Sequence, residues 1–205
     1  MNEFDTKAAA WDSNSMHHDR SAAIVDKLLN QIPFDRSMTA LEYGAGTGLA
    51  SFLLKDHLKE ITMMDSSPEM VRIMKEKVET TGSNNLKALL FDLEKVDLDE
   101  SEFDLVFTQM VLHHVSDIKN IIRKFCNILK PGGFLAIADL YPEDGSFHGE
   151  DFLGHKGFDP CELSALVNSL GFENTGVGKC FVIKKKISEL ETRQFDVFLL
   201  ITRKS

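Results

Sequence analysis

The sequence has few of the residues on which several common kinds of protein depend. Its 205 residues include three cysteines, Cys126, Cys161 and Cys180, whose spacing fits no metal site, and we expect all three to be buried in the core. No apolar run is long enough to cross a bilayer, and residues 1–12 have neither a basic region nor an apolar signal core. These absences predict a cytoplasmic protein with no membrane association.

Basic charge is also scarce. The chain has 23 Lys and Arg residues against 32 Asp and Glu residues, whereas proteins that bind nucleic acid usually cluster basic charge. The one basic run, Lys184 to Lys186, is short and followed by acidic residues, so we interpret it as a solvated turn. Nucleic acid is therefore not expected as a partner.

The chain alternates between stretches typical of strands and of helices. Its length and 43% hydrophobic content suit a single domain over residues 1–205, with an N-terminal helical segment over residues 1–33. Strands are predicted to end near residues 43 and 65 and to cover 86–91, 103–107, 134–140, 181–183 and 195–201; helices are predicted from 49, from 68, over 118–129 and over 159–170. The last two strands can pair antiparallel. This order predicts a three-layer α/β sandwich.

One connection is unusually long. Residues 142–158 are polar, rich in glycine and too long for an ordinary link between a strand and a helix. We expect this segment to be a functional loop or a lid.

The stretch LEYGAGTGLAS, residues 41–51, joins the first strand to a helix through Gly44, Gly46 and Gly48. Glycines at the end of a strand let a ligand approach the backbone closely. A dinucleotide fingerprint requires a different spacing, because Gly48 comes one place early and Leu49 stands at the sixth position. The carboxylate of Glu42 would repel a pyrophosphate and favour a cation, such as a sulfonium with an α-amino group.

Residues 42–48 resemble motif I of the class I S-adenosylmethionine-dependent methyltransferases. Residues 91–93, 103–115 and 129–133 are similar to later motifs of that family, in the same order, and the closest likeness is to small-molecule enzymes of the quinone-biosynthesis type. The resemblance implies a Rossmann-like, seven-stranded, mostly parallel sheet with a C-terminal antiparallel strand.

The resemblance also implies which residues bind the cofactor. Asp65 would accept hydrogen bonds from the ribose hydroxyls, and Asp92 would meet the adenine amino group between apolar neighbours. The full set expected to bind S-adenosylmethionine is Glu42, Gly44, Ala45, Gly46, Gly48, Asp65, Ser66, Met70, Phe91, Asp92, Leu93, Gln109 and Met110.

Methyl transfer requires a nucleophile aligned with the sulfonium methyl group and, for many acceptors, a base. The candidate bases are His113 and His114, which follow the fourth strand, and His148 and His155, in the long loop; a structural role that closes a turn is the alternative for the first pair. The candidate contacts to substrate are Trp11, His17, Phe147 and Phe158, and Trp11 could equally be a core residue.

The spacing of His148, Asp151 and His155 could suggest a metal site, but Gly149 and Gly154 disfavour a preformed ligand face, so no metal is expected. Residues 108–111 read Thr-Gln-Met-Val and differ from the AsnProProTyr-like motif of amino-directed enzymes that act on DNA or protein glutamine. The sequence also shows no acidic trio typical of metal-dependent catechol-type enzymes.

The best prediction is an S-adenosylmethionine-dependent methyltransferase acting on a small-molecule acceptor. Two alternatives stay open: a noncatalytic protein that binds S-adenosylmethionine, and an NAD-dependent oxidoreductase. The acceptor and the oligomeric state are not predicted.

Overall fold

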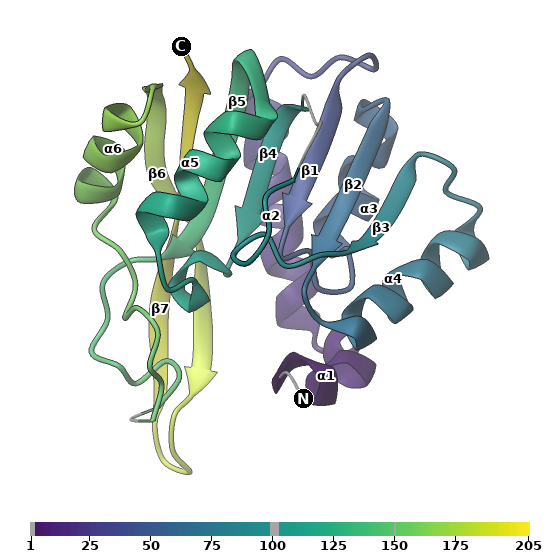
Figure 1. Ribbon diagram of the computed structural model, residues 1–205. Coiled ribbons are helices and arrows are strands. Elements are labelled where there is room, and N and C mark those ends of the chain that lie inside the picture. Colours follow the sequence, from purple (N-terminus) through teal and green to yellow (C-terminus); the bar gives the residue numbers. More distant parts are fainter. Residues whose placement is uncertain (1–2, 99–102, 150) are drawn as a thin grey trace.

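Stretches with apolar residues on both faces form one sheet in the computed structural model, which describes residues 3–98, 103–149 and 151–205 (Figure 1). The strands are β1 (Thr39–Tyr43), β2 (Glu60–Asp65), β3 (Leu86–Leu90), β4 (Phe103–Gln109), β5 (Leu129–Leu140), β6 (Phe172–Lys186) and β7 (Thr192–Lys204). Their order in the sheet is β3-β2-β1-β4-β5-β7-β6, and β7 runs antiparallel to both of its neighbours. The predicted fold class is confirmed.

Helices begin where the sequence supplies capping side chains. Ser67 accepts a hydrogen bond from the backbone N–H of Met70, and Asp159 accepts from Cys161 and Glu162, each before a proline in the first turn. The helices are α1 (Glu3–Lys7), α2 (Ser15–Gln31), α3 (Leu49–Leu54), α4 (Pro68–Thr81), α5 (Ile118–Ile128) and α6 (Pro160–Ser169), with short 3-10 segments at Ala8–Ser13, Lys55–His57 and Leu112–His114.

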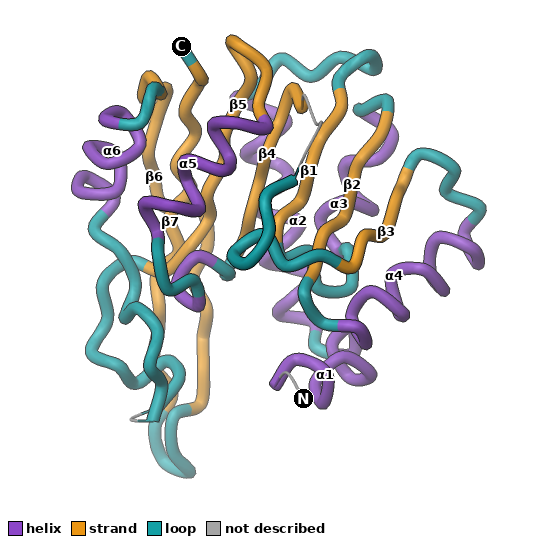
Figure 2. Tube along the Cα trace, viewed as in Figure 1, coloured by secondary structure: helices purple, strands orange, loops and turns teal. Residues whose placement is uncertain are grey.

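Successive side chains along each strand point to opposite faces of the sheet, so there are two cores, one on each face. In β1, Ala40 packs with α2, α3 and α4, whereas its neighbour Leu41 packs with α5 and α6. Figure 2 shows helices on both sides of the strands. Because each face is covered, the central strands are apolar almost throughout, as in other parallel sheets.

Four details differ from the sequence-based expectation. The predicted turn at residues 129–133 is the irregular start of β5, where the register with β4 shifts between Phe103 and Leu105. The last two strands are much longer than predicted, because polar residues alternate with apolar ones along their edges. Lys184 to Lys186 therefore end a strand rather than form a turn. Cys161 is exposed on the first turn of α6, and Cys126 and Cys180 are only half-buried.

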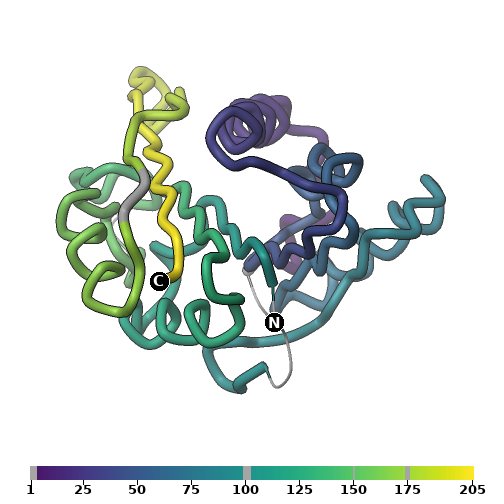
Figure 3. The backbone as a smooth tube through the Cα atoms, turned by 90° about the horizontal axis from the view of Figure 1, so that it is seen from above, coloured from purple at the N-terminus to yellow at the C-terminus, as the bar shows by residue number. Residues whose placement is uncertain are grey.

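The ends of the sheet curl toward each other when the molecule is viewed from above (Figure 3). As a result α2 contacts β6, although these elements are far apart in the sequence. The described residues include no helix long and apolar enough to cross a membrane. The carboxyl ends of β1, β2 and β4, together with α2 and the end of β6, contribute residues to one cavity.

Candidate active site

The glycine turn after β1 has one face open to a cavity. Gly44, Gly46 and Gly48 all have positive φ, of 67°, 58° and 82°. A Cβ on Gly44 would lie 2.5 Å from Val111, and one on Gly48 would lie 2.7 Å from Met63, so both glycines allow close packing of the protein itself. A Cβ on Gly46 would meet nothing nearer than the Trp11 indole at 3.7 Å. Gly46 is therefore the position where a ligand can approach the backbone.

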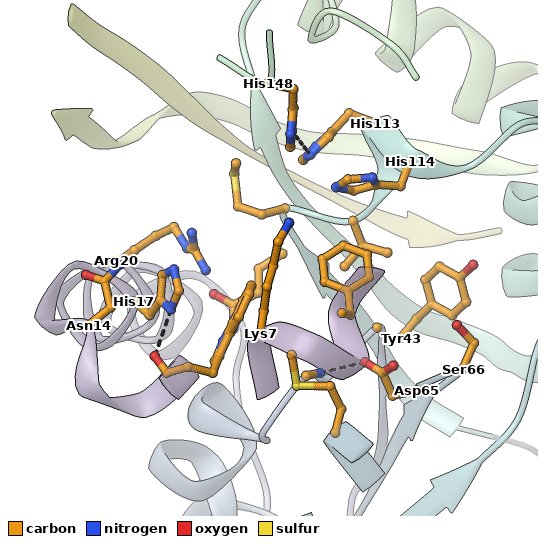
Figure 4. A pocket seen from close by; sticks show the side chains of 18 of the residues that line it. Lys7, Asn14, His17, Arg20, Tyr43, Asp65, Ser66, His113, His114 and His148 are labelled. Carbon is orange, nitrogen blue, oxygen red and sulfur yellow. Dashed lines mark hydrogen bonds between the residues drawn. The ribbon is translucent and has the colours of Figure 1, made fainter. Parts of the chain in front are cut away.

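Asp65, at the end of β2, lies against this turn. One carboxylate oxygen accepts a 2.8 Å hydrogen bond from the Gly46 N–H, and the other accepts a 2.8 Å bond from the Ser67 N–H. Burial raises the pKa of the Asp65 carboxyl, and these backbone N–H groups oppose the shift. The carboxylate is thus fixed at the cavity wall, as Figure 4 shows.

Glu42 has no exposed surface, and it does not line the cavity. Its carboxylate accepts hydrogen bonds from the backbone and hydroxyl of Ser51 and from the Gln109 side chain. Burial raises its pKa to about 7, while the bonds from Ser51 and Gln109 lower it. Gln109, which does line the cavity, stands between Glu42 and any ligand.

The raised pKa of Glu42 predicts a pH-dependent stability. Because the folded-state pKa of about 7 exceeds the ordinary value of 4.5, this group's contribution is complete below pH 4.5 and is lost as the pH rises through 7. The variant Glu42→Gln removes the ionisation with little change in size. Relative to this variant, the wild-type unfolding free energy is expected to fall by about 1 to 3 kcal/mol between pH 5 and pH 8. Urea unfolding of both proteins without cofactor measures this; an unchanged difference would contradict it.

The N-terminal segment is fastened over the glycine turn. Asp12 accepts hydrogen bonds from the Thr47 hydroxyl and the Lys77 ammonium, at 2.5 and 2.9 Å. The Trp11 ring lies 4.2 Å from the ring of His17, whose Nδ1 is 3.0 Å from the Trp11 carbonyl. Trp11 and His17 both line the cavity, so this segment forms its cover.

Two histidines, His113 and His148, line the opposite half of the cavity, and Asp139 lies behind His113. Asp139, buried at the end of β5, lies 2.6 Å from His113 Nδ1, and His113 Nε2 lies 3.0 Å from His148 Nε2 (Figure 4). Burial first, and then the neighbouring His113 and His114, lowers the pKa of His148 to about 3. His148 is therefore neutral at physiological pH.

The same cluster could hold a metal ion. Ring nitrogens of His113, His114 and His148 lie within 4.8 Å of one another, and a carboxylate behind a ligating histidine, as Asp139 stands behind His113, is common in metal sites. The 3.0 Å separation of the two Nε2 atoms is also an ordinary hydrogen-bond length, so that pair is satisfied without a metal. The set His148, Asp151 and His155, considered from the sequence, differs from the cluster that the fold brings together, which is His113, His114 and His148.

The long loop 142–158 is anchored at several points. The backbone N–H of His155 donates to the His113 carbonyl, its Nε2 lies 3.1 Å from the Val115 carbonyl, and the N–H of Phe158 donates to the Leu140 carbonyl. Phe147 is buried against Phe195, with ring centroids 5.0 Å apart. These contacts place Phe147 and His148 on the cavity wall.

The cavity has a volume of about 650 Å³ and joins these two halves. The predicted site residues that line it are Trp11, His17, Gly44, Gly46, Asp65, Ser66, Met70, Phe91, Asp92, Leu93, Gln109, Met110, His113, His114, Phe147 and His148. The predicted residues outside the lining are Glu42, Ala45, Gly48, His155 and Phe158. His155 instead lines a smaller neighbouring cavity, and Phe158 packs in the core beside α5 and α6.

Several residues of this cavity were not predicted as site residues from the sequence. Lys7, Arg20 and Lys185 line it, and Asp139 supports His113 from behind. The isolated acid in the apolar strand at residues 134–140 was the available signal for Asp139, since a buried carboxylate requires partners. Met110, which directly follows β4 and lines the cavity, has a φ of 57°, a conformation that is rare outside glycine.

Comparison with known proteins agrees with this geometry. The family described as "Methyltransferase domain" matches residues 41–137. An uncharacterized methyltransferase of Schizosaccharomyces pombe, C1347.09, is 31% identical over 156 residues, which cover 68% of this chain and 55% of that protein. A chain in the Haloferax volcanii complex of the Trm112 methyltransferase activator with a methyltransferase has a TM-score of 0.79 at 20% identity, covering 100% of this chain and 98% of that one. The N-methyltransferase NodS of Bradyrhizobium japonicum, solved with S-adenosyl-L-homocysteine, has a TM-score of 0.71 at 18% identity, covering 94% and 89%.

Residues 41–137 therefore match the methyltransferase-domain family, and the chain as a whole has the fold of solved methyltransferases. The chain spans about half the length of the S. pombe relative.

Proposed function

We propose that this chain transfers the methyl group of S-adenosylmethionine to a small-molecule acceptor. The observation that carries the proposal is the continuous cavity, which joins the Asp65 wall to the histidine cluster. A volume of about 650 Å³ lies in the range of sites for small ligands. The cavity has one polar wall suited to a nucleoside and another suited to an acceptor.

The cofactor fits the half around Asp65. Its ribose hydroxyls would donate to Asp65, its adenine would lie between Phe91 and Leu93 with the amino group toward Asp92, and its amino acid portion would lie over Gly46. Gly46, which lines the cavity and has room for a further atom beneath the Trp11 indole, and the half-buried Asp65 carboxylate support this placement. Ser66, Met70, Gln109 and Met110 complete the wall, and Glu42 acts through its hydrogen bond with Gln109.

The acceptor would occupy the half lined by the histidines, where Asp139, His113 and His148 form a proton acceptor. Only one hydrogen can lie between the two Nε2 atoms. His148 can therefore take up the acceptor's proton while the shared hydrogen passes to His113, where the Asp139 carboxylate, 2.6 Å from Nδ1, stabilises positive charge. As the acceptor atom bonds to the methyl carbon, the carbon–sulfur bond breaks and the acceptor's proton passes to this pair. S-adenosylmethionine supplies an activated methyl group, so the protein's task is mainly to align the reactants and take this proton.

The direct test is incubation of the protein with methyl-labelled S-adenosylmethionine and a fractionated metabolite extract. A labelled small-molecule product is expected with wild type and not with Gly46→Arg, which fills the open position of the glycine turn. A protein that binds S-adenosylmethionine but yields no product across the extract would instead be a noncatalytic binding protein. Preferential binding of NAD in a thermal-shift comparison would indicate the oxidoreductase alternative.

A further inference from the structure

Positive charge gathers at one end of the cavity, although the chain as a whole has a net charge of −9. The cationic residues that line the cavity are Lys7, Arg20, Lys184, Lys185 and Lys186, and the acidic ones are Asp65, Asp92 and Glu94. The three acids follow β2 and β3, at the proposed nucleoside end. The cations come from the N-terminal segment, α2 and the end of β6, beside the histidine cluster.

Arg20 is the most unusual of these cations, because it is only 6% exposed and no carboxylate of the described residues forms an ion pair with it. Within that part of the chain it makes one hydrogen bond, a 3.9 Å contact from Nη1 to the sulfur of Met16, and its Nε has no hydrogen-bond partner. Figure 4 shows the guanidinium directed into the cavity from α2. A buried guanidinium without an anion is costly, so a bound ligand is the expected source of one.

The nearby acids are already engaged. Asp139 is the carboxylate whose charge acts on Arg20, but its oxygens accept from the ring and backbone of His113 and from the Leu140 N–H. Glu143, whose charge acts on Lys185, accepts from the backbone of Gly145 and Phe147. Neither Asp139 nor Glu143 therefore accepts a hydrogen bond from Arg20, and the guanidinium is left without a directly bound anion from these two acids.

Lys185, near the end of β6, adds positive charge to the same cavity that Arg20 enters from α2. Its ammonium donates to the Phe147 carbonyl and lies 4.5 Å from the centroid of the Phe147 ring. Phe147 immediately precedes His148 in the sequence. Burial lowers its pKa, and the charge of Lys7 lowers it further. The charges of Lys7 and Lys185 also act on His148, so all three groups share one region of the cavity.

We propose that Arg20 binds a carboxylate of the methyl acceptor, and therefore that the enzyme acts on small organic acids. The proposal rests on the proposed function, since it names the substrate class of that site. A planar guanidinium can bind a carboxylate with two parallel hydrogen bonds. The long-range field of Lys7 and Lys185 favours the same anion.

The cofactor's own carboxylate is the other source of this chemistry, and a binding experiment separates the two. Wild-type protein and Arg20→Met, each saturated with S-adenosyl-L-homocysteine, are titrated calorimetrically with benzoate and with benzamide, which match in shape and differ in charge. Arg72→Met, which removes an exposed arginine of α4, is the control. Arg20→Lys keeps the charge and loses the planar fork.

Wild type and Arg72→Met are expected to bind benzoate in preference to benzamide. Arg20→Met is expected to bind benzoate at least about tenfold more weakly, with Arg20→Lys in between and the affinity for S-adenosyl-L-homocysteine unchanged. Absence of benzoate binding, equal binding of benzamide, or undiminished benzoate binding by Arg20→Met would overturn the proposal. So would a tenfold loss of affinity for S-adenosyl-L-homocysteine, which would assign Arg20 to the cofactor. Because the titration needs no turnover, a failure of methyl transfer is a separate result.

Discussion

Asp65→Asn is expected to bind S-adenosylmethionine at least about 100-fold more weakly than wild type, because two hydrogen bonds from ribose hydroxyls to a charged carboxylate are lost or weakened. The carboxylate uses both of its oxygens in the protein, one toward Gly46 and one toward Ser67. Asparagine has a single acceptor oxygen, so it cannot keep both backbone contacts and receive the ribose as well. Isothermal titration with S-adenosyl-L-homocysteine measures the loss.

The fold should survive this change. Asp65 is at the end of its strand, and the variant removes a charge whose burial is itself unfavourable. A melting temperature near that of wild type would show that the loss is local. Asp117→Asn, at the cap of α5 and outside the cavity lining, provides the matched control and should bind the cofactor normally. Wild-type affinity in Asp65→Asn would refute the assignment of Asp65 to the ribose.

His148→Gln is expected to lower kcat for the labelled product by about 10² to 10⁴-fold while leaving the affinity for S-adenosyl-L-homocysteine nearly unchanged. In the proposed mechanism His148 and His113 together accept the proton, and the cofactor is proposed to bind in the other half of the cavity. His113→Gln should have a similar effect. His57→Gln, an exposed histidine distant from the cavity lining, should keep wild-type kcat.

The double variant distinguishes a shared role from two separate ones. If His113 and His148 act as one unit, His113→Gln/His148→Gln should lose little more activity than either single variant. Wild-type kcat in His148→Gln would contradict the proton-transfer role. The alternative role of the three histidines is metal binding, and elemental analysis tests it. A stoichiometric metal in wild type that is absent from His148→Gln would show that these rings bind a metal instead of accepting the proton.

The sequence could predict that the residues of the proposed cofactor half line one cavity, because that half is built from local sequence. The glycine turn and Asp92 come just after strands and Asp65 ends one, and the carboxyl ends of parallel strands meet at one edge of a sheet. Even here the roles within the turn were not predictable. Whether a glycine serves a ligand, as Gly46 can, or close packing, as Gly44 and Gly48 do, depends on Val111, which follows β4, and on Met63 of β2.

The acceptor half could be predicted only in part, because its residues meet through the curl of the sheet. Arg20 comes from α2, Asp139 from β5 and Lys185 from the end of β6, and no sequence spacing relates these elements. The run at Lys184 to Lys186 resembles a solvated turn in sequence, yet its strand extends to the cavity. The histidines were identifiable as candidates, but the pairing of His148 with His113, and the separation of His155 from the cavity, depend on how the loop 142–158 is anchored.

One cavity is proposed to place the cofactor's reactive sulfur between a nucleoside wall and an acceptor wall. A crystal structure of the complex with S-adenosyl-L-homocysteine tests this placement. The predicted result has the ribose hydroxyls on Asp65, the sulfur facing the side of the cavity that holds His113 and His148, and the space beside Arg20 left open for an acceptor. A ligand whose ribose lies away from Asp65, or whose amino acid portion fills the space between Arg20 and the histidines, would contradict the account.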